Sequence, residues 1–128
     1  MDIFISETKD TPKIHISVDE GLFEITGNSF SLSVIDFYKP ILEWIKNDLP
    51  LVTKDLNCTF KLEIVNSETI KIFTEILFKL NSFYENGKSI NIKWIFNEDD
   101  EDVYEIGIML SEMAKIPFTF EMFEDLRN

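Results

Sequence analysis

The chain has little of what metal and nucleophile chemistry requires. It contains one cysteine, Cys58, and one histidine, His15, among 128 residues. A single cysteine excludes an intrachain disulfide, and one Cys with one His excludes a zinc site of the usual composition. The four glycines form no glycine-rich phosphate loop. We therefore expect no metal, no cofactor and no catalytic residue, with Cys58 as a small core residue and His15 as a surface or cross-strand residue.

Long apolar runs and positive charge are also scarce. No run approaches the ~20 apolar residues of a membrane helix, and the start, Met1 to Phe4, lacks the basic and apolar regions of a signal peptide. The chain has 12 Lys and Arg but 24 Asp and Glu, which gives a net charge of -12. This charge repels nucleic-acid phosphates and anionic lipid. We expect a cytoplasmic protein that binds neither nucleic acid nor membranes and prefers partners with a basic patch.

What the chain does have is enough apolar material for a core. Hydrophobic residues make up 45% of the sequence, with 12 Phe, which is too apolar for a disordered chain. Its length suits a single domain over residues 1–128. The acidic run 98–102 lacks the Gly and the terminal Glu of a calcium-binding EF-hand loop, so we interpret it as a solvated turn.

Hydrophobic periodicity predicts the elements, since alternation indicates strands and three-to-four spacing indicates helices. The expected strands are 2–8, a hairpin of 13–18 with 22–26, then 58–65, 89–96 and a last strand through Phe118, Phe120 and Met122. The expected helices are 40–49, 67–84 and one that carries Val103 to Met113 before Pro117. The first helix is begun at Pro40 because an internal proline removes a hydrogen bond. The tail 124–128 is expected to fray.

This order of elements predicts the fold class. Three successive strand–helix–strand crossovers imply parallel strands with right-handed connections, and strands rich in Phe and Ile fit covered sheet faces. We predict a single α/β domain with a mixed, mostly parallel sheet, an N-terminal antiparallel hairpin and about three helices.

The polar corner Asn66-Ser67-Glu68-Thr69 is the most informative stretch, because it joins an apolar strand to a long amphipathic helix. The first N–H groups of a helix lack partners, and its N-terminus favours negative charge. An ordinary helix cap explains Asn66 or Ser67. The alternative is a phosphorylation switch, in which a phosphate on Ser67 makes a recognition surface anionic without unfolding the helix.

Several stretches together resemble one bacterial family, the SiaC-type regulatory phosphoproteins, which were first catalogued as a domain of unknown function. The likeness is carried in order by residues 11–14, 21–29, 37–44, 65–71 and 92–94, and it spans nearly the whole chain. Each motif alone is weak, whereas their order and spacing are specific. Two stretches depart from the family. Ser31-Leu32-Ser33 stands where the family often has Pro-Glu-Asn, and the charged residues of the turn at 97–102 are all acidic where a relative has mixed charge.

The resemblance implies a fold similar to STAS domains and a partner switch. A dedicated protein kinase would phosphorylate Ser67, a position at which the family also has Thr, and a PP2C-like phosphatase would remove the phosphate. Thr69 is the second candidate acceptor. The unphosphorylated form would bind and activate a diguanylate cyclase, controlling cyclic di-GMP, aggregation and biofilm. The partner-binding residues would be Asn66, Ser67, Glu68, Thr69 and Lys71. Two alternatives stay open: an antagonist that binds an anti-sigma-factor kinase, and a small enzyme.

Overall fold

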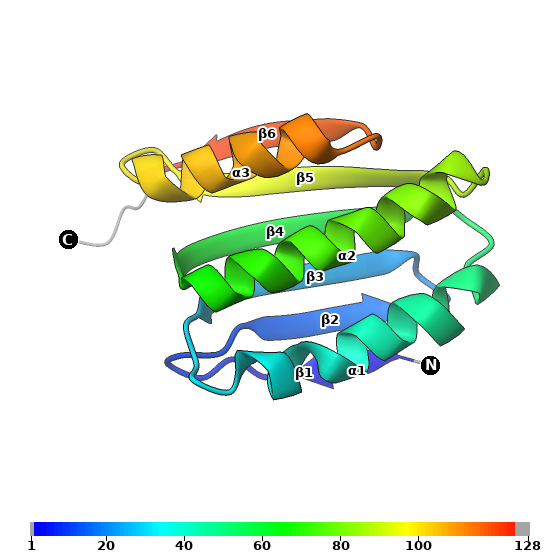
Figure 1. Cartoon of the computed structure of the whole chain (residues 1–128), viewed down its shortest axis with the longest axis horizontal. Coiled ribbons are helices and arrows are strands. Elements are labelled where there is room, and N and C mark those ends of the chain that lie inside the picture. Colours follow the sequence, from blue (N-terminus) through cyan, green and yellow to red (C-terminus); the bar gives the residue numbers. More distant parts are fainter. Residues whose placement is uncertain (1, 125–128) are drawn as a thin grey trace.

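A computed structural model, which describes residues 2–124, contains a six-stranded sheet with three α-helices (Figure 1). The strands are β1 (Ile3–Ile5), β2 (Lys13–Ser17), β3 (Leu22–Ser29), β4 (Leu56–Val65), β5 (Ile90–Asn97) and β6 (Phe118–Phe123). The helices are α1 (Val34–Asn47), the short 3-10 helix η1 (Leu49–Leu51), α2 (Ser67–Glu85) and α3 (Glu101–Met113). The expected fraying of the tail falls mostly on residues 125–128, outside the described residues.

The strands lie in sequence order, β1-β2-β3-β4-β5-β6. β2 is antiparallel to both β1 and β3, and β3, β4, β5 and β6 are mutually parallel. The predicted mixed, mostly parallel sheet with an N-terminal hairpin is therefore confirmed. Gly21, with a φ of 65°, closes the hairpin turn before β3, a backbone conformation that glycine adopts without steric cost.

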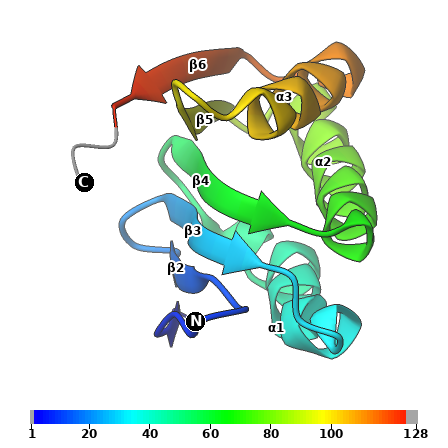
Figure 2. The same cartoon turned by 90° about the vertical axis from the view of Figure 1, so that its left-hand side faces the viewer.

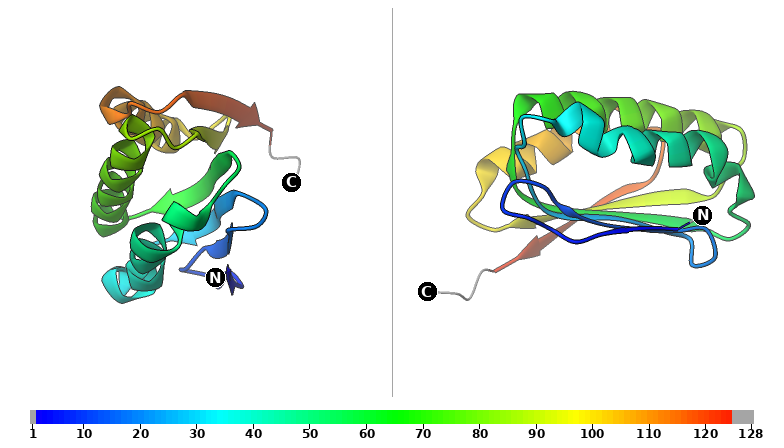
Figure 3. Two further views of the ribbon diagram at one scale, coloured as in Figure 1. Left: turned by 90° about the vertical axis from the view of Figure 1, so that its right-hand side faces the viewer. Right: turned by 90° about the horizontal axis from the view of Figure 1, so that it is seen from below.

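All three helices cover the same face of the sheet, as the view from below in Figure 3 shows. The physical reason is topological: crossovers of one hand that each step one strand in the same direction place every helix on the same side. The expectation that both faces are covered was wrong. Consequently β4 alternates, with Leu56, Cys58, Phe60 and Leu62 buried under the helices while Asn57 and Glu63 are exposed.

Aromatic rings connect the parallel strands beneath the helices. Phe60 of β4 stacks on Trp94 of β5 at a centroid distance of 5.6 Å, and it also contacts Phe73 of α2 at 5.3 Å. The Trp94 indole N–H donates to the Val103 carbonyl at 3.0 Å. A Cβ at Gly107 would lie 2.5 Å from the Trp94 ring, so only glycine lets α3 approach this closely.

The first helix begins at Val34, six residues before the predicted start at Pro40. Pro40 lies inside α1, and its ring is on the exposed side of the helix. The proline removes one N–H donor, but the carbonyl left without it lies toward water on that side. The buried Val34, Tyr38, Ile41 and Ile45 hold both halves against the sheet, which outweighs the local preference.

Candidate functional site

The carboxyl ends of the parallel strands and the N-termini of all three helices meet at one edge of the sheet, on the left in Figure 1 and facing the viewer in Figure 2. We refer to it as the carboxyl edge. This arrangement follows from the strand–helix order, since each crossover helix starts where its strand ends. The predicted corner 66–69 lies in the middle of this edge, between β4 and α2.

Asn66 is the N-cap of α2, as its residue type suggested. Its backbone is extended, and its side-chain oxygen accepts a hydrogen bond from the Thr69 N–H at 2.9 Å. The Asn66 backbone N–H donates to the Ser29 carbonyl at 3.1 Å, which ties the corner to the end of β3. The cap role therefore belongs to Asn66, and the Ser67 hydroxyl is not needed for it.

Ser67 is the first residue of α2 and is exposed. It stands at the positive end of a 19-residue helix, where a negative group is favoured. Glu68 follows on the exposed surface and pairs with Lys71 at 3.3 Å, one turn further on. Surface pairs of this kind contribute little to stability, so these three side chains offer a polar surface that a partner can reorganise.

Thr69 differs from Ser67 in exposure and in hydrogen bonding, the two properties that decide whether a modifying enzyme can reach a hydroxyl. Its side chain is 0% exposed. Its hydroxyl donates to the Ser29 carbonyl at 3.0 Å and lies 2.8 Å from the Ser29 hydroxyl. The Ser29 hydroxyl in turn lies 2.8 Å from the Tyr38 hydroxyl of α1. A kinase would have to break this buried hydrogen-bonded chain to reach Thr69, whereas the Ser67 hydroxyl faces solvent.

The buried chain is electrostatically neutral. Burial raises the pKa of Tyr38 well above its ordinary value, an effect that the hydrogen bond between Tyr38 and Ser29 only partly opposes. Tyr38 is therefore a phenol at all physiological pH values. The three hydroxyls join β3, α1 and α2 directly beneath the exposed corner, so they fix its shape without placing a charge there.

The two residues with catalytic potential lie on opposite faces of the sheet. Cys58 pairs with Phe23, faces the helices and is buried, and burial raises its pKa. His15 pairs with Glu24 on the open face and lies 3.8 Å from its carboxylate. The sheet separates them, so they form no Cys–His pair. Among residues 2–124, no three His, Cys, Asp or Glu side chains gather as a metal site.

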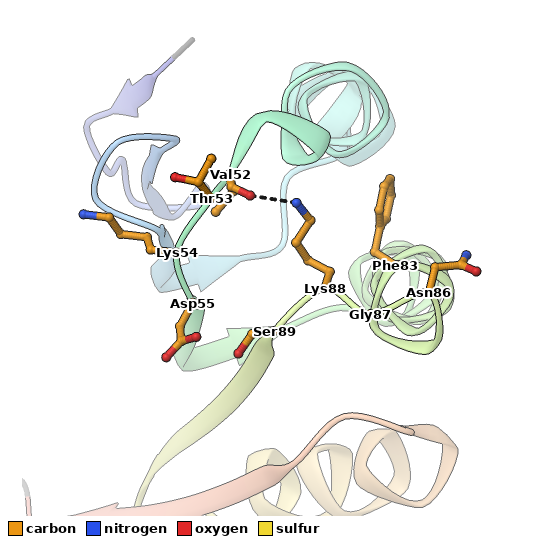
Figure 4. A pocket seen from close by; sticks show the side chains of 9 residues that line it. All are labelled: Val52, Thr53, Lys54, Asp55, Phe83, Asn86, Gly87, Lys88 and Ser89. Atoms are coloured by element: carbon orange, nitrogen blue, oxygen red, sulfur yellow. Dashed lines mark hydrogen bonds between the residues drawn. The ribbon is translucent and has the colours of Figure 1, made fainter.

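The opposite edge of the sheet, which we call the amino edge, contains a pocket of about 520 Å³ (Figure 4). Lys88 points across this pocket to η1, where its ammonium donates to the Val52 carbonyl at 2.7 Å and the Pro50 carbonyl at 3.4 Å. Lys54 extends away from Lys88 in Figure 4. The cation that this pocket offers to an anionic ligand is thus already bound to backbone oxygens.

The fold is a six-stranded sheet covered by three α-helices, with a capped and exposed corner where β4 meets α2. The sequence pattern of the SiaC family of regulatory phosphoproteins matches residues 5–123, so the chain belongs to that family. No helix within residues 2–124 is long and apolar enough to span a membrane.

Individual relatives come from Pseudomonas aeruginosa. An uncharacterised protein of strain UCBPP-PA14 is 22% identical over 124 residues, which covers 97% of this chain and 98% of that protein. Apo-SiaC is similar in structure with a TM-score of 0.85 at 22% identity, covering 94% of this chain and 98% of that one. A chain in the crystal structure of the diguanylate cyclase SiaD in complex with its activator SiaC gives 0.89 at 22% identity, covering 95% and 100%.

Ser29 and Tyr38 are part of the site, and reasoning from the sequence missed them. Their residue types gave one signal, since a Ser and a Tyr in apolar surroundings need hydrogen-bond partners when buried. The sequence gives no indication that their partner is Thr69, because 40 residues separate Ser29 from it.

Proposed function

We propose that this chain is a non-enzymatic regulatory phosphoprotein that switches partners through phosphorylation of Ser67. A dedicated protein kinase adds the phosphate and a PP2C-like phosphatase removes it, in the cytoplasm. The observation that carries the proposal is the exposed Ser67 hydroxyl at the first position of α2, beside a cap that Asn66 already supplies. Membership of a family of regulatory phosphoproteins supports it.

The output partner in this proposal is a diguanylate cyclase. The unphosphorylated form binds and activates the cyclase, which raises cyclic di-GMP and promotes aggregation and biofilm. Support comes from the structural likeness to SiaC, which forms a complex with the cyclase SiaD as its activator. The contact surface would include Asn66, Ser67, Glu68 and Lys71 at the rim of the corner, while Thr69 would support them from below.

The switch works at the interface and not by refolding. α2 buries Ile72, Phe73, Ile76, Leu77 and Leu80, each contributing about 1.5–3 kcal/mol, so one added charge does not melt it. A partner that packs on the neutral corner would instead have to desolvate a phosphate dianion without a prepared cation. Phosphorylation therefore weakens binding while leaving the fold intact.

The proposal is tested by incubating the protein with ATP and its cognate protein kinase, followed by intact-protein mass spectrometry. We expect one added phosphate that is lost in Ser67→Ala and retained in Ser82→Ala, which removes another exposed serine of α2. A phosphate that persists in Ser67→Ala rejects Ser67 as the acceptor. Phosphopeptide mapping would then decide between Thr69 and another residue.

The cyclase assignment needs its own measurement. Purified cyclase is mixed with wild type, Ser67→Ala or Ser67→Asp, and cyclic di-GMP formation is followed. We expect activation by wild type and Ser67→Ala, and loss of activation with Ser67→Asp. If pull-downs with the same variants instead recover an anti-sigma-factor kinase and no cyclase, the protein is an antagonist of that kinase.

A further inference from the structure

A groove lies on the carboxyl edge beside the corner, between the end of β4 and the start of α3. It has a volume of about 290 Å³ and is lined by Glu63, Ile64, Val65, Asp100, Asp102, Val103 and Ile106. Aliphatic side chains form much of its wall, and Ile64 is 57% exposed. An aliphatic residue this exposed at the mouth of a groove offers apolar area to a partner.

α2 follows β4 in the chain and carries exposed apolar area of its own on the side that contacts α3. Asn81 holds the far ends of α2 and α3 together, since its amide donates to the Met113 carbonyl at 3.0 Å and accepts from the Lys115 N–H at 2.9 Å. Helical spacing places Ile70, Thr74 and Phe78 on the Asn81 side of α2. Phe78 is 55% exposed, so this side of α2 is not fully covered by α3.

The α3 side combines apolar and acidic residues. Met109 follows Ile106 by almost one turn and is 40% exposed. The 13 residues of α3 contain no Lys or Arg and four acidic residues, which are Glu101, Asp102, Glu105 and Glu112. The turn before it adds Glu98, Asp99 and Asp100. The charged residues of α3 and of the turn before it are therefore all negative, and Asp100 and Asp102 line the groove.

We infer that the surface between α2 and α3 binds an amphipathic helix of a protein partner that carries Lys or Arg along one flank. This surface, here called the α2–α3 groove, is formed by Ile64, Ile106, Met109, Ile70 and Phe78. The apolar stripe of such a helix fills the space between α2 and α3, and its basic flank meets the acidic residues of α3. A neutral or acidic helix gains the apolar contact and loses the charge complementarity, so the groove selects for positive charge.

This inference deepens the proposed function and rests on it only for the role of Ser67. Ser67 precedes Ile70 by three residues and so lies on the same side of α2, at the open end of the groove. A phosphate there stands where the first apolar anchor of the partner helix must be desolvated. The groove thus explains how a modification of one hydroxyl can control binding along a whole helix.

A synthetic peptide tests the groove without any kinase or cyclase. The probe is a capped helix of about 18 residues, or five turns, with Leu at i, i+3, i+4 and i+7 spacing and Lys elsewhere. Controls are a scrambled peptide of the same composition and a peptide with Glu replacing Lys. Binding to the full chain is measured by fluorescence anisotropy at about 0.15 M salt, where long-range attraction is screened. We expect only the first peptide to bind tightly.

Matched variants locate the binding site. Ile64→Ser and Phe78→Ser should each weaken binding about tenfold or more, whereas Leu51→Ser, which removes a 61% exposed side chain at the amino edge, should not. Asp102→Asn should weaken binding, and Asp36→Asn, an equal charge loss in the first turn of α1, should not. Ile64, Phe78 and Leu51 are each more than half exposed and the two aspartates are exposed, and circular dichroism checks each fold.

Any of the following results would overturn the inference. If the scrambled peptide binds as tightly as the amphipathic peptide, charge alone explains the binding. If Leu51→Ser weakens binding as much as Ile64→Ser does, the contact lies elsewhere. Sedimentation showing a dimer that Ile64→Ser dissolves would mean that a second copy of the chain occupies the groove. If the peptide fails to bind while Ser67 is phosphorylated as proposed, only the groove assignment fails. If the peptide binds and no phosphate appears on Ser67, only the proposed switch fails.

Discussion

At the carboxyl edge the Ser67 hydroxyl is exposed next to a helix N-terminus, while at the amino edge the Lys88 ammonium is bound to the carbonyl oxygens of Pro50 and Val52. The pocket described at the amino edge has a volume of about 520 Å³, against about 290 Å³ for the groove at the carboxyl edge. The Lys88 ammonium of this pocket, however, binds the backbone carbonyls at the end of η1, so we expect Lys88 to contribute to stability. The two edges therefore differ in which polar side chain a partner can reach: Ser67 is exposed, whereas the Lys88 ammonium is already bound.

The carboxyl edge has two layers: a buried lower part, formed by the hydrogen-bonded Thr69, Ser29 and Tyr38, and an exposed upper part, formed by Ser67, Glu68 and Lys71. Thr69, Ser29 and Tyr38 satisfy one another below the surface, whereas Ser67, Glu68 and Lys71 lie above it. Mutations in the lower part should therefore cost stability, and mutations in the upper part should change recognition. The predictions below test this division, starting with the largest expected effect.

Thr69→Val keeps the shape of the side chain and removes its hydroxyl. It leaves the Ser29 carbonyl without that donor, so we expect the free energy of unfolding to fall by about 1–3 kcal/mol in urea denaturation. Ser67→Ala, the matched change in the upper part, should alter it by less than about 0.5 kcal/mol. Equal effects from the two variants would show that the hydroxyl chain does not support the corner.

Alkaline pH should destabilise the fold through Tyr38. Its pKa is raised in the folded state, while in the unfolded chain it ionises near pH ~10. The stabilisation is complete below that pH and declines above it, by up to about 1.4 kcal/mol per pH unit. Urea titrations between pH 9 and 11 in a Cys58→Ala background, which removes the other buried acid, should show this slope, and Tyr38→Phe should lack it.

Lys88→Met tests the amino edge. It keeps the apolar stem and removes the ammonium that binds two carbonyls, so we expect a loss of about 1 kcal/mol in thermal or urea unfolding. Lys54→Met, a change at an exposed lysine of the same pocket, should be nearly neutral. Neither variant should change phosphorylation of Ser67. An altered phosphorylation rate in Lys88→Met alone would couple the two edges and break the comparison.

Ser67→Asp should raise stability slightly. A carboxylate at the first position of α2 interacts favourably with the helix dipole, by about 0.3–1 kcal/mol at low salt. The matched change Ser82→Asp lies in the last turn of the same helix and should destabilise by a similar amount. Thermal unfolding at low and high salt checks both signs, since screening should remove them. Destabilisation by Ser67→Asp would contradict a site that tolerates a phosphate.

Much of the fold followed from local pattern. The alternation of Ile14 and Ile16, the stripe through Phe73 and Leu77, and Asn86 with Gly87 at the end of α2 indicated elements that the structure confirms. Pro40 misled the prediction, because its local cost is outweighed by packing on both sides of it. The one-sided sheet was also missed, since it depends on the direction in which successive crossovers step.

Periodicity, residue type and the order of the elements determined the mostly parallel sheet, the long second helix and a polar corner capped by Asn66 or Ser67, because sterics and hydrophobic spacing act within a few residues. Only the tertiary structure decided which of two neighbouring hydroxyls faces outward. Ser67 and Thr69 are two residues apart, and Thr69 is buried because β3 and α1, distant in sequence, pack over that side of the helix. Burial depends on how the sheet and the helices pack together, so only the folded protein determines which of the two hydroxyls is accessible.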